Sequence, residues 1–462
     1  MAPVTRAADA TSARQWHETA GSGDRKGVWG LKGALGEAVA LAGTLILLFG
    51  CPGFAITMWF TMTNLDSSLH NLCAYFYQQG PWGLYYLWPR PSAEAWLTLL
   101  VFGSLQALLQ LALPGRRHEG PTTPKGNTPV YKANGVKAYF TTLALFVVGW
   151  RLGLFSPARI YDLFGEILSA LNIFSLLLCF GLFVKGHLAP SSSDCGSSGS
   201  LVYDFYWGME LYPRIGSKFD IKTWTNCRMG MMGWGVLILC YAVKQAEASP
   251  GGLANSMAVS VTLMHLYIFK FFLWESGYWM TMDIAHDRAG YYLCWGCLNW
   301  VPAIYTSPAL HLVQHPGQLS SATAAAIFVA GAACVFINYD SDRQRQVFRE
   351  TSGKAKVWGR APKIVNASYT TGSGGTKKSL LLASGWWGLS RHFHYLPEIG
   401  AAFFWTLPAL FAYPLPYFYT LFLTLLLLDR AFRDDARCAS KYGKFWQQYC
   451  KLVPYKIVPL IF

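Results

Sequence analysis

The segment DRAFRDDARCASKYGKFW, residues 429–446, carries side chains that could bind an anion. Four of them recur at intervals of four residues: Arg430, Asp434, Cys438 and Tyr442. This spacing places them along one face of a helix. Arginine presents a fixed fork of donors that suits phosphate oxygens, and an acid can orient that fork or bind a hydroxyl. The segment therefore indicates an anion site. A solvated amphipathic helix with ordinary i, i+4 ion pairs is the alternative.

A second basic stretch, RQRQVFRETSGKAKVWGRAPK, covers residues 343–363. Arg345 and Arg349 are again four residues apart, and they would form a basic pocket if they met the first cluster. Trp358 could stack on a flat ring there. The alternative is a basic anchor on the cytoplasmic side of a membrane span.

A third stretch, SGWWGLSRHFHYLPE, covers residues 384–398. An aromatic belt at the membrane interface would explain its tryptophans and Tyr395. It explains Arg391, His392 and His394 less easily, because polar groups near membrane depth are costly and mark functional sites.

A fourth stretch, ESGYWMTMDIAHDRAGYYLCWG, covers residues 275–296. Asp283, Asp287 and Tyr291 are spaced four apart, with His286 between them, so a continuous helix would present them together. Acids and a tyrosine at the mouth of a helix bundle suit proton delivery, since burial can raise a carboxyl pKa toward neutrality. Helix caps and loop charges are the alternative.

Two other motifs predict no site. The pair of cysteines in CWGC, residues 294–297, lies in an apolar run without a second pair, so no metal site is expected. The segment TTGSGGT, residues 370–376, lacks the spacing of a phosphate loop and is expected to be a flexible linker with no strand before it. No alternation of strands and helices suggests a Rossmann domain, so a nucleotide would have to bind among membrane helices.

The elements that must position these residues follow from the composition. Hydrophobic residues make up 53% of the 462 and charged residues 13%, against about 25% charged in a soluble domain. The net charge of +14 is divided among separate loops. This division favours cytoplasmic loops of a membrane protein over a nucleic-acid surface.

The apolar runs predict an all-α polytopic membrane protein with about ten spans. The last run, 397–428, is broken by prolines and is expected to form a hairpin of two short helices. The expected spans lie near 34–60, 95–113, 137–157, 161–185, 229–246, 254–275, 291–313, 321–338 and, as a pair, 397–428.

Charge sets the expected topology and domains. A cytoplasmic N-terminus places the loops 114–136, 186–228, 276–290 and 339–396 and the tail after 428 on the cytoplasmic side. Residues 201–228 are too apolar for a solvated loop, so they are expected to fold back on the bundle. The predicted division is a disordered tail over 1–32, helices with a substrate cavity over 33–338, and a cofactor-binding part over 339–462.

Four of these segments, in this order, resemble the sterol reductase family of the endoplasmic reticulum. The segments DIAHDRAGYYLCWGC, VWGRAPK, LLLASGWWGLSRHFHYLPE and RDDARCASKYGKFWQQYC are most similar to its Δ7-reducing branch, particularly the plant type. The likeness runs from about residue 30 to the C-terminus. It implies a ten-helix bundle and NADPH-dependent reduction of the C7–C8 double bond of Δ5,7-sterols. It also implies a membrane sterol as substrate, cytoplasmic termini and other sterol-biosynthesis enzymes as partners.

The resemblance implies a cofactor pocket on the cytoplasmic side. This chain departs from the family pattern at two positions where many members have asparagine: it has His394 at one and Asp342 at the other. Asp342 is expected to point away from the phosphates. The expected cofactor-binding residues are Arg345, Arg349, Trp358, Trp387, Arg391, His392, His394, Tyr395, Arg430, Asp434, Cys438 and Tyr442.

Reduction of an unactivated double bond requires a proton donor on one sterol face and a hydride source on the other. The donor candidates, which the sequence does not rank, are Tyr291, Asp287, Asp283 and His286; the expected substrate contacts are Glu210, Trp279 and Tyr292. Glu210 could orient the sterol 3-hydroxyl. The competing hypotheses are a Δ14- or C-24(28)-reductase, a non-catalytic membrane scaffold, an isoprenylcysteine-type methyltransferase and a transporter.

Overall fold

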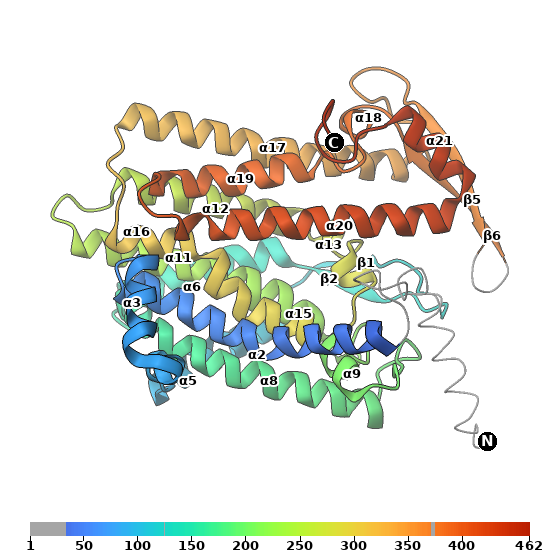
Figure 1. Ribbon diagram of the computed structural model, residues 1–462. Helices are drawn as coiled ribbons and strands as arrows, with labels where there is room; N and C mark the ends of the chain where they lie inside the picture. The colour runs from blue at the N-terminus through green and yellow to red at the C-terminus, as the bar shows by residue number, and fades with distance from the viewer. Residues whose placement is uncertain (1–33, 124, 371–374) are drawn as a thin grey trace. The chain divides into compact units, whose positions relative to one another are not determined.

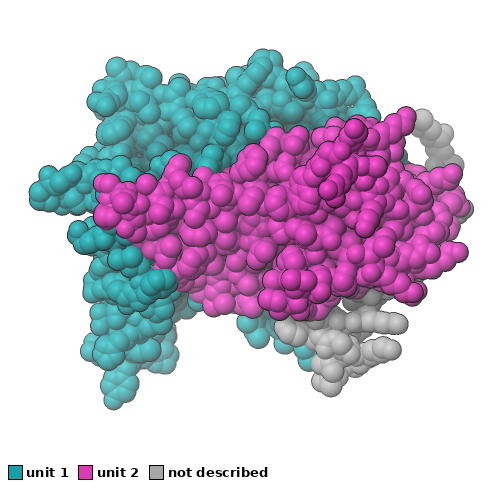
Figure 2. Space-filling model, turned by 90° about the horizontal axis from the view of Figure 1, so that it is seen from above, with its two compact units in different colours: residues 1–319, 409–416 teal, residues 320–408, 417–462 magenta. Residues whose placement is uncertain are grey.

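The computed structural model describes residues 34–123, 125–370 and 375–462. The predicted disordered tail, 1–32, and most of the predicted linker, 370–376, lie outside the described residues. The chain forms two compact units, coloured separately in Figure 2. Unit 1 contains residues 1–319 and 409–416, and unit 2 contains residues 320–408 and 417–462.

Long apolar helices dominate both units, which confirms the predicted class of helical membrane protein. Seven helices of the described residues are long and apolar enough to cross a membrane. The expected total of about ten stays a prediction. The seven segments are Ala38–Asn64, Ala93–Ala112, Phe164–Leu188, Ile221–Ala248, Asn255–Leu273, Ser321–Glu350 and Leu415–Tyr442.

Unit 1 is a helical bundle with two short hairpins (Figure 1). Its longer helices are α2 (Ala34–Asn64), α5 (Ala93–Ala112), α6 (Gly135–Arg151), α8 (Phe164–Leu188), α11 (Met232–Ala248) and α12 (Asn255–Leu273). The shorter ones are α3 (Leu69–Gln79), α4 (Gly83–Leu87), α7 (Pro157–Asp162), α9 (Leu201–Trp207), α10 (Ile221–Thr223), α13 (Glu275–Tyr278), α14 (Met282–Ala285), α15 (Tyr291–Trp295) and α16 (Ser307–Gln314). The antiparallel hairpins pair β1 (Arg116–Glu119) with β2 (Val130–Ala133), and β3 (Arg214–Ile215) with β4 (Phe219–Asp220).

Two π-helices lie side by side in the interior of unit 1: η2 (Trp224–Met231) and η3 (Gly296–Tyr305). π-Helical turns are rare and are frequently found at functional sites. Seven residues of η2 are buried, among them the polar side chains of Asn226 and Arg228. The interior of unit 1 therefore contains polar groups that a purely structural apolar bundle would not need.

Three connecting segments of unit 1 meet at one end of α2 and α8 (Figure 1). Arg214 Nη2 donates to the Val130 carbonyl at 2.7 Å, and Ala289 N donates to the Glu210 carbonyl at 2.9 Å. These bonds link the loops 114–136, 186–228 and 276–290 at the same end, as the predicted topology requires. Residues 209–212 are buried, so the expectation that this segment folds back on the bundle is confirmed.

Unit 2 contains α17 (Ser321–Glu350), α18 (Trp386–Leu389), α19 (Tyr395–Thr406), α20 (Phe418–Tyr442), α21 (Lys444–Leu452) and one hairpin. In it, α17 packs on α19, and α19 packs on α20. The expected pair of helices over 397–428 is present as α19 and α20, but the expectation that both are short is wrong. No glycine or proline interrupts α20 before Gly443, whose positive φ of 52° ends the helix.

The hairpin of unit 2 corrects the expectation that no strand precedes the glycine-rich segment. β5 (Ile364–Thr370) pairs antiparallel with β6 (Thr376–Leu382), in register from Ile364 with Leu382 to Thr370 with Thr376. Val365 lies in an apolar cluster with Trp446 and Tyr449 of α21. Burial of alternate residues of β5 against α21 stabilises this strand. The polar residues of the segment do not predict a strand from the sequence.

The compact units divide the chain at residue 319, because all of α17 belongs with α19 and α20. The functional division at residue 338 stays a prediction.

Candidate functional site

The last two turns of α17 carry Arg345 and Arg349, the two arginines of the second basic stretch that were predicted to form a basic pocket. The Arg345 guanidinium carbon lies 4.1 Å from the centroid of the Trp387 ring. Trp387 Nε1 donates to the Ser341 carbonyl at 2.8 Å, so α17 also holds the tryptophan in place. Stacking on an indole is a geometry that arginine favours and lysine does not reproduce. Trp387 therefore forms a wall that presents the Arg345 cation.

Asp342 does not point away from this cluster, contrary to the expectation from the sequence. Its carboxylate is buried and lies 3.6 Å from Arg345 Nη2, one helical turn away. One long contact leaves most of the five guanidinium donors of Arg345 available to another acceptor. Arg349, on the exposed end of α17, forms no ion pair with any described residue. The cluster therefore keeps cationic donors that could bind phosphate oxygens.

The predicted face of α20 is present. Asp434 Oδ1 lies 2.5 Å from Arg437 Nη2, while Oδ2 lies 3.8 Å from Cys438 Sγ. Arg349 lies within electrostatic range of Asp434, Cys438 and Tyr442. The spacing of four residues thus places the three α20 side chains on the same side as the α17 arginines.

The distal end of this face meets the hairpin. The Tyr442 hydroxyl lies 3.4 Å from Ser379 Oγ of β6, and its ring packs edge-on against Tyr369 of β5. Arg430 lies one turn before Asp434 on α20 and is half-buried.

The segment between α18 and α19 adds a stack of rings. His392 stacks nearly parallel on Tyr395, with centroids 5.3 Å apart, and His394 lies 4.9 Å from Trp387 and 4.3 Å from Tyr395. Burial lowers the pKa of His392 to about 4, although Asp434, whose Oδ2 lies 3.9 Å from Nε2, acts in the opposite direction. His392 is therefore neutral near pH 7 and can both donate and accept a hydrogen bond.

Two expected cofactor contacts do not converge with the others. Arg391 Nη1 donates to the carbonyls of Val453 and Pro454 at 2.9 and 2.8 Å, so this guanidinium faces the segment after α21. Trp358 is 56% exposed and packs edge-on against Trp386. Trp387 and Arg391 are four residues apart and would share a face of a continuous helix, but α18 ends at Leu389, and this turn redirects the arginine.

Tyr449 of α21 belongs to the cluster, although sequence reasoning did not identify it. Its buried hydroxyl donates to the Trp387 carbonyl at 3.3 Å, and it lies within electrostatic range of Arg345. It follows Tyr442 by seven residues, a helical interval. Gly443 interrupts the helix between the two tyrosines, so the four-residue spacing of the α20 face does not extend to Tyr449 in the sequence.

In unit 1, the four proton-donor candidates do not share one helix face, which corrects the prediction. Helix α14 ends at Ala285, and α15 begins only at Tyr291. A tertiary contact breaks the helix: a Cβ on Gly290 would lie 2.2 Å from the backbone nitrogen of Gly208. The close approach of two backbones at these glycines requires a loop here.

The candidates consequently have different surroundings. The Tyr291 hydroxyl donates to the Leu48 carbonyl of α2 at 3.2 Å, and its ring stacks on Trp295. His286 is exposed, whereas Asp283 and Asp287 are half-buried.

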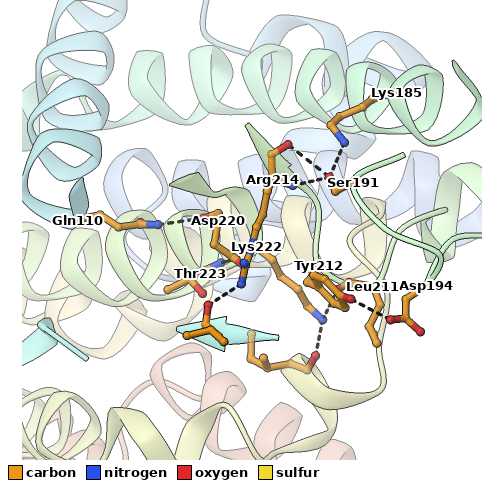
Figure 3. Close-up of polar contacts among 12 residues, drawn as sticks. Gln110, Lys185, Ser191, Asp194, Leu211, Tyr212, Arg214, Asp220, Lys222 and Thr223 are labelled. Carbon is orange, nitrogen blue, oxygen red and sulfur yellow. Dashed lines mark hydrogen bonds and ion pairs between the residues drawn. The ribbon is translucent and has the colours of Figure 1, made fainter. Parts of the chain in front are cut away.

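Buried Lys222 anchors the loop that contains Asp287. Its Nζ donates to the carbonyls of Leu211 at 3.2 Å and Ile284 at 2.9 Å, and also to the Asp287 carbonyl (Figure 3 shows Lys222 and Leu211). Three backbone acceptors from two loops make Lys222 a structural anchor.

The expected substrate contacts of unit 1 also separate. Glu210 is buried, with Oε1 2.7 Å from Lys185 Nζ and Oε2 2.5 Å from the Ser191 nitrogen. Each oxygen thus already accepts from one protein donor, and the suggestion that Glu210 orients a sterol hydroxyl stays a prediction. Trp279 is fully buried and stacks on Tyr131 of β2. Tyr292 packs instead against Trp207 of α9, with ring centroids 5.0 Å apart.

Tyr278, at the end of α13, is a further polar group that sequence reasoning missed. Asn226 Nδ2 of the π-helix η2 donates to its hydroxyl oxygen at 3.3 Å. A hydroxyl that accepts in this way keeps its own proton for donation. Asp283 lies within electrostatic range of Tyr278.

The sequence profile of the ergosterol biosynthesis ERG4/ERG24 family matches residues 25–462, and the chain belongs to this family. It is 58% identical over 424 residues to the 7-dehydrocholesterol reductase of Arabidopsis thaliana, which covers 92% of this chain and 98% of the relative. It is 35% identical to the Xenopus laevis protein of the same name, over 81% of this chain and 83% of the relative. A Delta(14)-sterol reductase of Methylotuvimicrobium alcaliphilum is 32% identical, over 90% and 94%.

Family membership makes this chain a multi-pass membrane oxidoreductase of sterol biosynthesis that uses a reduced nicotinamide cofactor. The donor set of unit 2 fits such a group. It offers the Arg345 and Arg349 cations for a pyrophosphate, with the buried Trp387 ring holding the Arg345 guanidinium in place.

Proposed function

We propose that this chain reduces the C7–C8 double bond of Δ5,7-sterols, with NADPH as cofactor, in the endoplasmic reticulum membrane with both termini cytoplasmic. The observation that supports it most is the 58% identity to a 7-dehydrocholesterol reductase across nearly the whole length of both chains. A Δ14-reductase is the second candidate, because a relative of that name is similar over 90% of this chain.

Unit 2 supports NADPH as the cofactor. NADPH carries one phosphate more than NADH, so it requires additional cationic donors. Besides Arg345 and Arg349, this end of unit 2 carries Lys377 and Lys378 on β6 and Lys441 beside Tyr369, whose ring centroid lies 4.2 Å from the Lys441 Nζ. A bound reduced nicotinamide supplies hydride, while these cationic side chains compensate the charge of the phosphates.

The proton must come from the protein on the other face of the sterol. An unactivated alkene accepts hydride poorly, so protonation of one carbon has to generate positive charge on the other. Nearby aromatic faces would stabilise that charge. We propose Tyr278 as the donor, because its hydroxyl oxygen accepts from Asn226 Nδ2 at 3.3 Å and so keeps its own proton for donation. Of the four donor candidates from the sequence, Asp283 is retained as its charged neighbour.

A direct assay tests the function. Purified protein in detergent with NADPH is expected to convert a Δ5,7-sterol to the Δ5 product, detected by mass spectrometry, and to leave a Δ8,14-sterol unchanged. Conversion of the Δ8,14-sterol alone would establish the Δ14 alternative. Sterol binding without turnover of either substrate would show a scaffold. Replacing NADPH by S-adenosylmethionine tests the methyltransferase hypothesis in the same preparation.

The donor assignment predicts unequal effects of three substitutions. Tyr278→Phe removes the proton and should lower kcat by roughly 100-fold or more, the usual contribution of a general acid. Tyr291→Phe removes only a bond to α2, and Asp287→Asn leaves intact the carbonyl that Lys222 binds. Both should therefore keep kcat within about tenfold of the unmodified enzyme. Single-turnover rates at saturating NADPH would check this, and normal turnover by Tyr278→Phe would contradict it.

A further inference from the structure

The residues that follow α21, 453–462, fold back along the segment that carries the candidate pocket. We call them the C-terminal strap. The nitrogens of Arg391 and His392 donate to the carbonyls of Tyr455 and Lys456 at 2.9 and 2.8 Å. Ser390 Oγ donates to the Ile457 carbonyl at 2.6 Å. Three consecutive residues before α19 are thus bonded to three consecutive residues of the strap.

Asp435 of α20 joins the strap to the rest of unit 2. Its carboxylate lies 3.4 Å from Arg391 Nε and 3.5 Å from Lys456 Nζ. Trp446 Nε1 of α21 donates to it at 3.2 Å. One acid therefore connects α20, α21, the strap and the segment before α19. Such a network, two partly buried ion pairs and one hydrogen bond on the same carboxylate, is stronger than an isolated surface pair.

The two adjacent acids of α20, Asp434 and Asp435, contact different groups. Asp434 faces Arg437, Cys438 and the imidazole of His392, which belong to the candidate pocket. Asp435 faces Arg391 and the strap. His392 is held from both sides, with its backbone nitrogen bonded to the strap and its ring beside Asp434. Movement of the strap would therefore displace the His392 ring and its stacking partner Tyr395.

We propose that Asp435, Arg391 and Lys456 are positioning residues for the cofactor site. They clamp the strap onto residues 390–392 and so orient His392 toward Asp434. This inference rests on the proposed NADPH site but assigns Arg391 a different role from a direct phosphate contact, because its Nη1 donates to the Val453 and Pro454 carbonyls and its Nε lies 3.4 Å from the Asp435 carboxylate. Small displacements of positioned groups cost disproportionately in binding and rate.

The test measures NADPH binding by titration calorimetry on the purified full-length protein, beside steady-state kinetics with the sterol. Asp435→Asn and Lys456→Met are expected to raise the Kd for NADPH about tenfold, while KM for the sterol and kcat at saturating NADPH stay within about twofold. Asp435→Glu keeps the charge and should restore most of the affinity. Asp429→Asn is the matched control, because Asp429 lies on the same helix and its carboxylate pairs with Arg433 at an exposed position.

Two results would overturn the positioning role: unchanged NADPH affinity in both clamp variants with only a lowered melting temperature, or a loss of kcat without a change in NADPH affinity. Absence of NADPH binding by the unmodified protein would instead overturn the proposed cofactor. Lys456→Met keeps the Arg391–Asp435 pair, so it reports on the strap even when Asp435→Asn fails to fold.

Discussion

Substitution of Arg349 by alanine is expected to raise the Kd for NADPH roughly 10- to 100-fold. A hydrogen bond to a charged group contributes about 1.5–3 kcal/mol, and about 1.4 kcal/mol corresponds to a factor of ten in affinity. Arg349 forms no ion pair with any residue in the described part of the chain, so its charge is available to a ligand. Arg345→Ala should have an effect of the same size. Isothermal titration of the purified protein with NADPH measures both.

Two further variants make this experiment specific. Arg345→Lys keeps the charge but loses the planar stack on Trp387, so it should lose less affinity than Arg345→Ala. Arg343→Ala is the control, because Arg343 is exposed on the same helix and pairs with Asp340 at 2.9 Å. Unchanged affinity in both alanine variants at 345 and 349 would remove the argument for a phosphate pocket at the end of α17.

Substitution of Glu275 by glutamine is expected to destabilise the protein strongly. Its carboxylate lies 2.6 Å from Arg228 Nη2, and both side chains are almost completely buried. Glu275 Oε2 also accepts from the Gly135 nitrogen at 2.8 Å, and Arg228 donates to Asn134 Oδ1 at 2.9 Å. Removing one partner of a buried pair leaves an uncompensated charge and typically costs about 3–5 kcal/mol. Thermal unfolding in detergent should show a large fall in Tm.

An exposed ion pair of the same length provides the comparison. Arg159 Nη2 lies 2.6 Å from Glu94 Oε2, but both side chains are about half exposed. Pairs of this kind contribute about 0–1 kcal/mol, so Arg159→Ala should barely change Tm. Equal changes in Tm for Glu275→Gln and Arg159→Ala would show that burial does not increase the contribution of the Arg228–Glu275 pair to stability. The double variant Arg228→Met with Glu275→Leu should recover stability, since apolar residues replace both charges.

Much of unit 2 could be predicted because its pattern is local. A helix repeats every 3.6 residues, so the intervals among Asp434, Cys438 and Tyr442 place their side chains together without knowledge of any other segment. The same holds for Arg345 and Arg349 on α17. The meeting of these two helix faces was only a hypothesis from the sequence, and the structure brings them within electrostatic range of each other.

Prediction failed where a contact between distant segments ends an element. The expected face of Asp283, Asp287 and Tyr291 required one helix, but the close approach of Gly208 and Gly290 replaces the middle of it with a loop. The sequence did not predict β5, the strand before the glycine-rich segment. This strand is buried by α21, which begins more than 70 residues later in the chain.

Composition and periodicity by themselves determined the membrane class and, within an uninterrupted helix such as α17 or α20, which residues share a face, because both depend on neighbours a few positions apart. Only the tertiary structure decided which protein groups those side chains contact. Glu210 and Arg391 were expected to be site residues from the sequence, and the structure shows that they also bind protein groups: Lys185 and Ser191 for Glu210, and the Val453 and Pro454 carbonyls for Arg391. A polar side chain can serve a ligand only with donors or acceptors that the fold leaves available, and that depends on long-range packing.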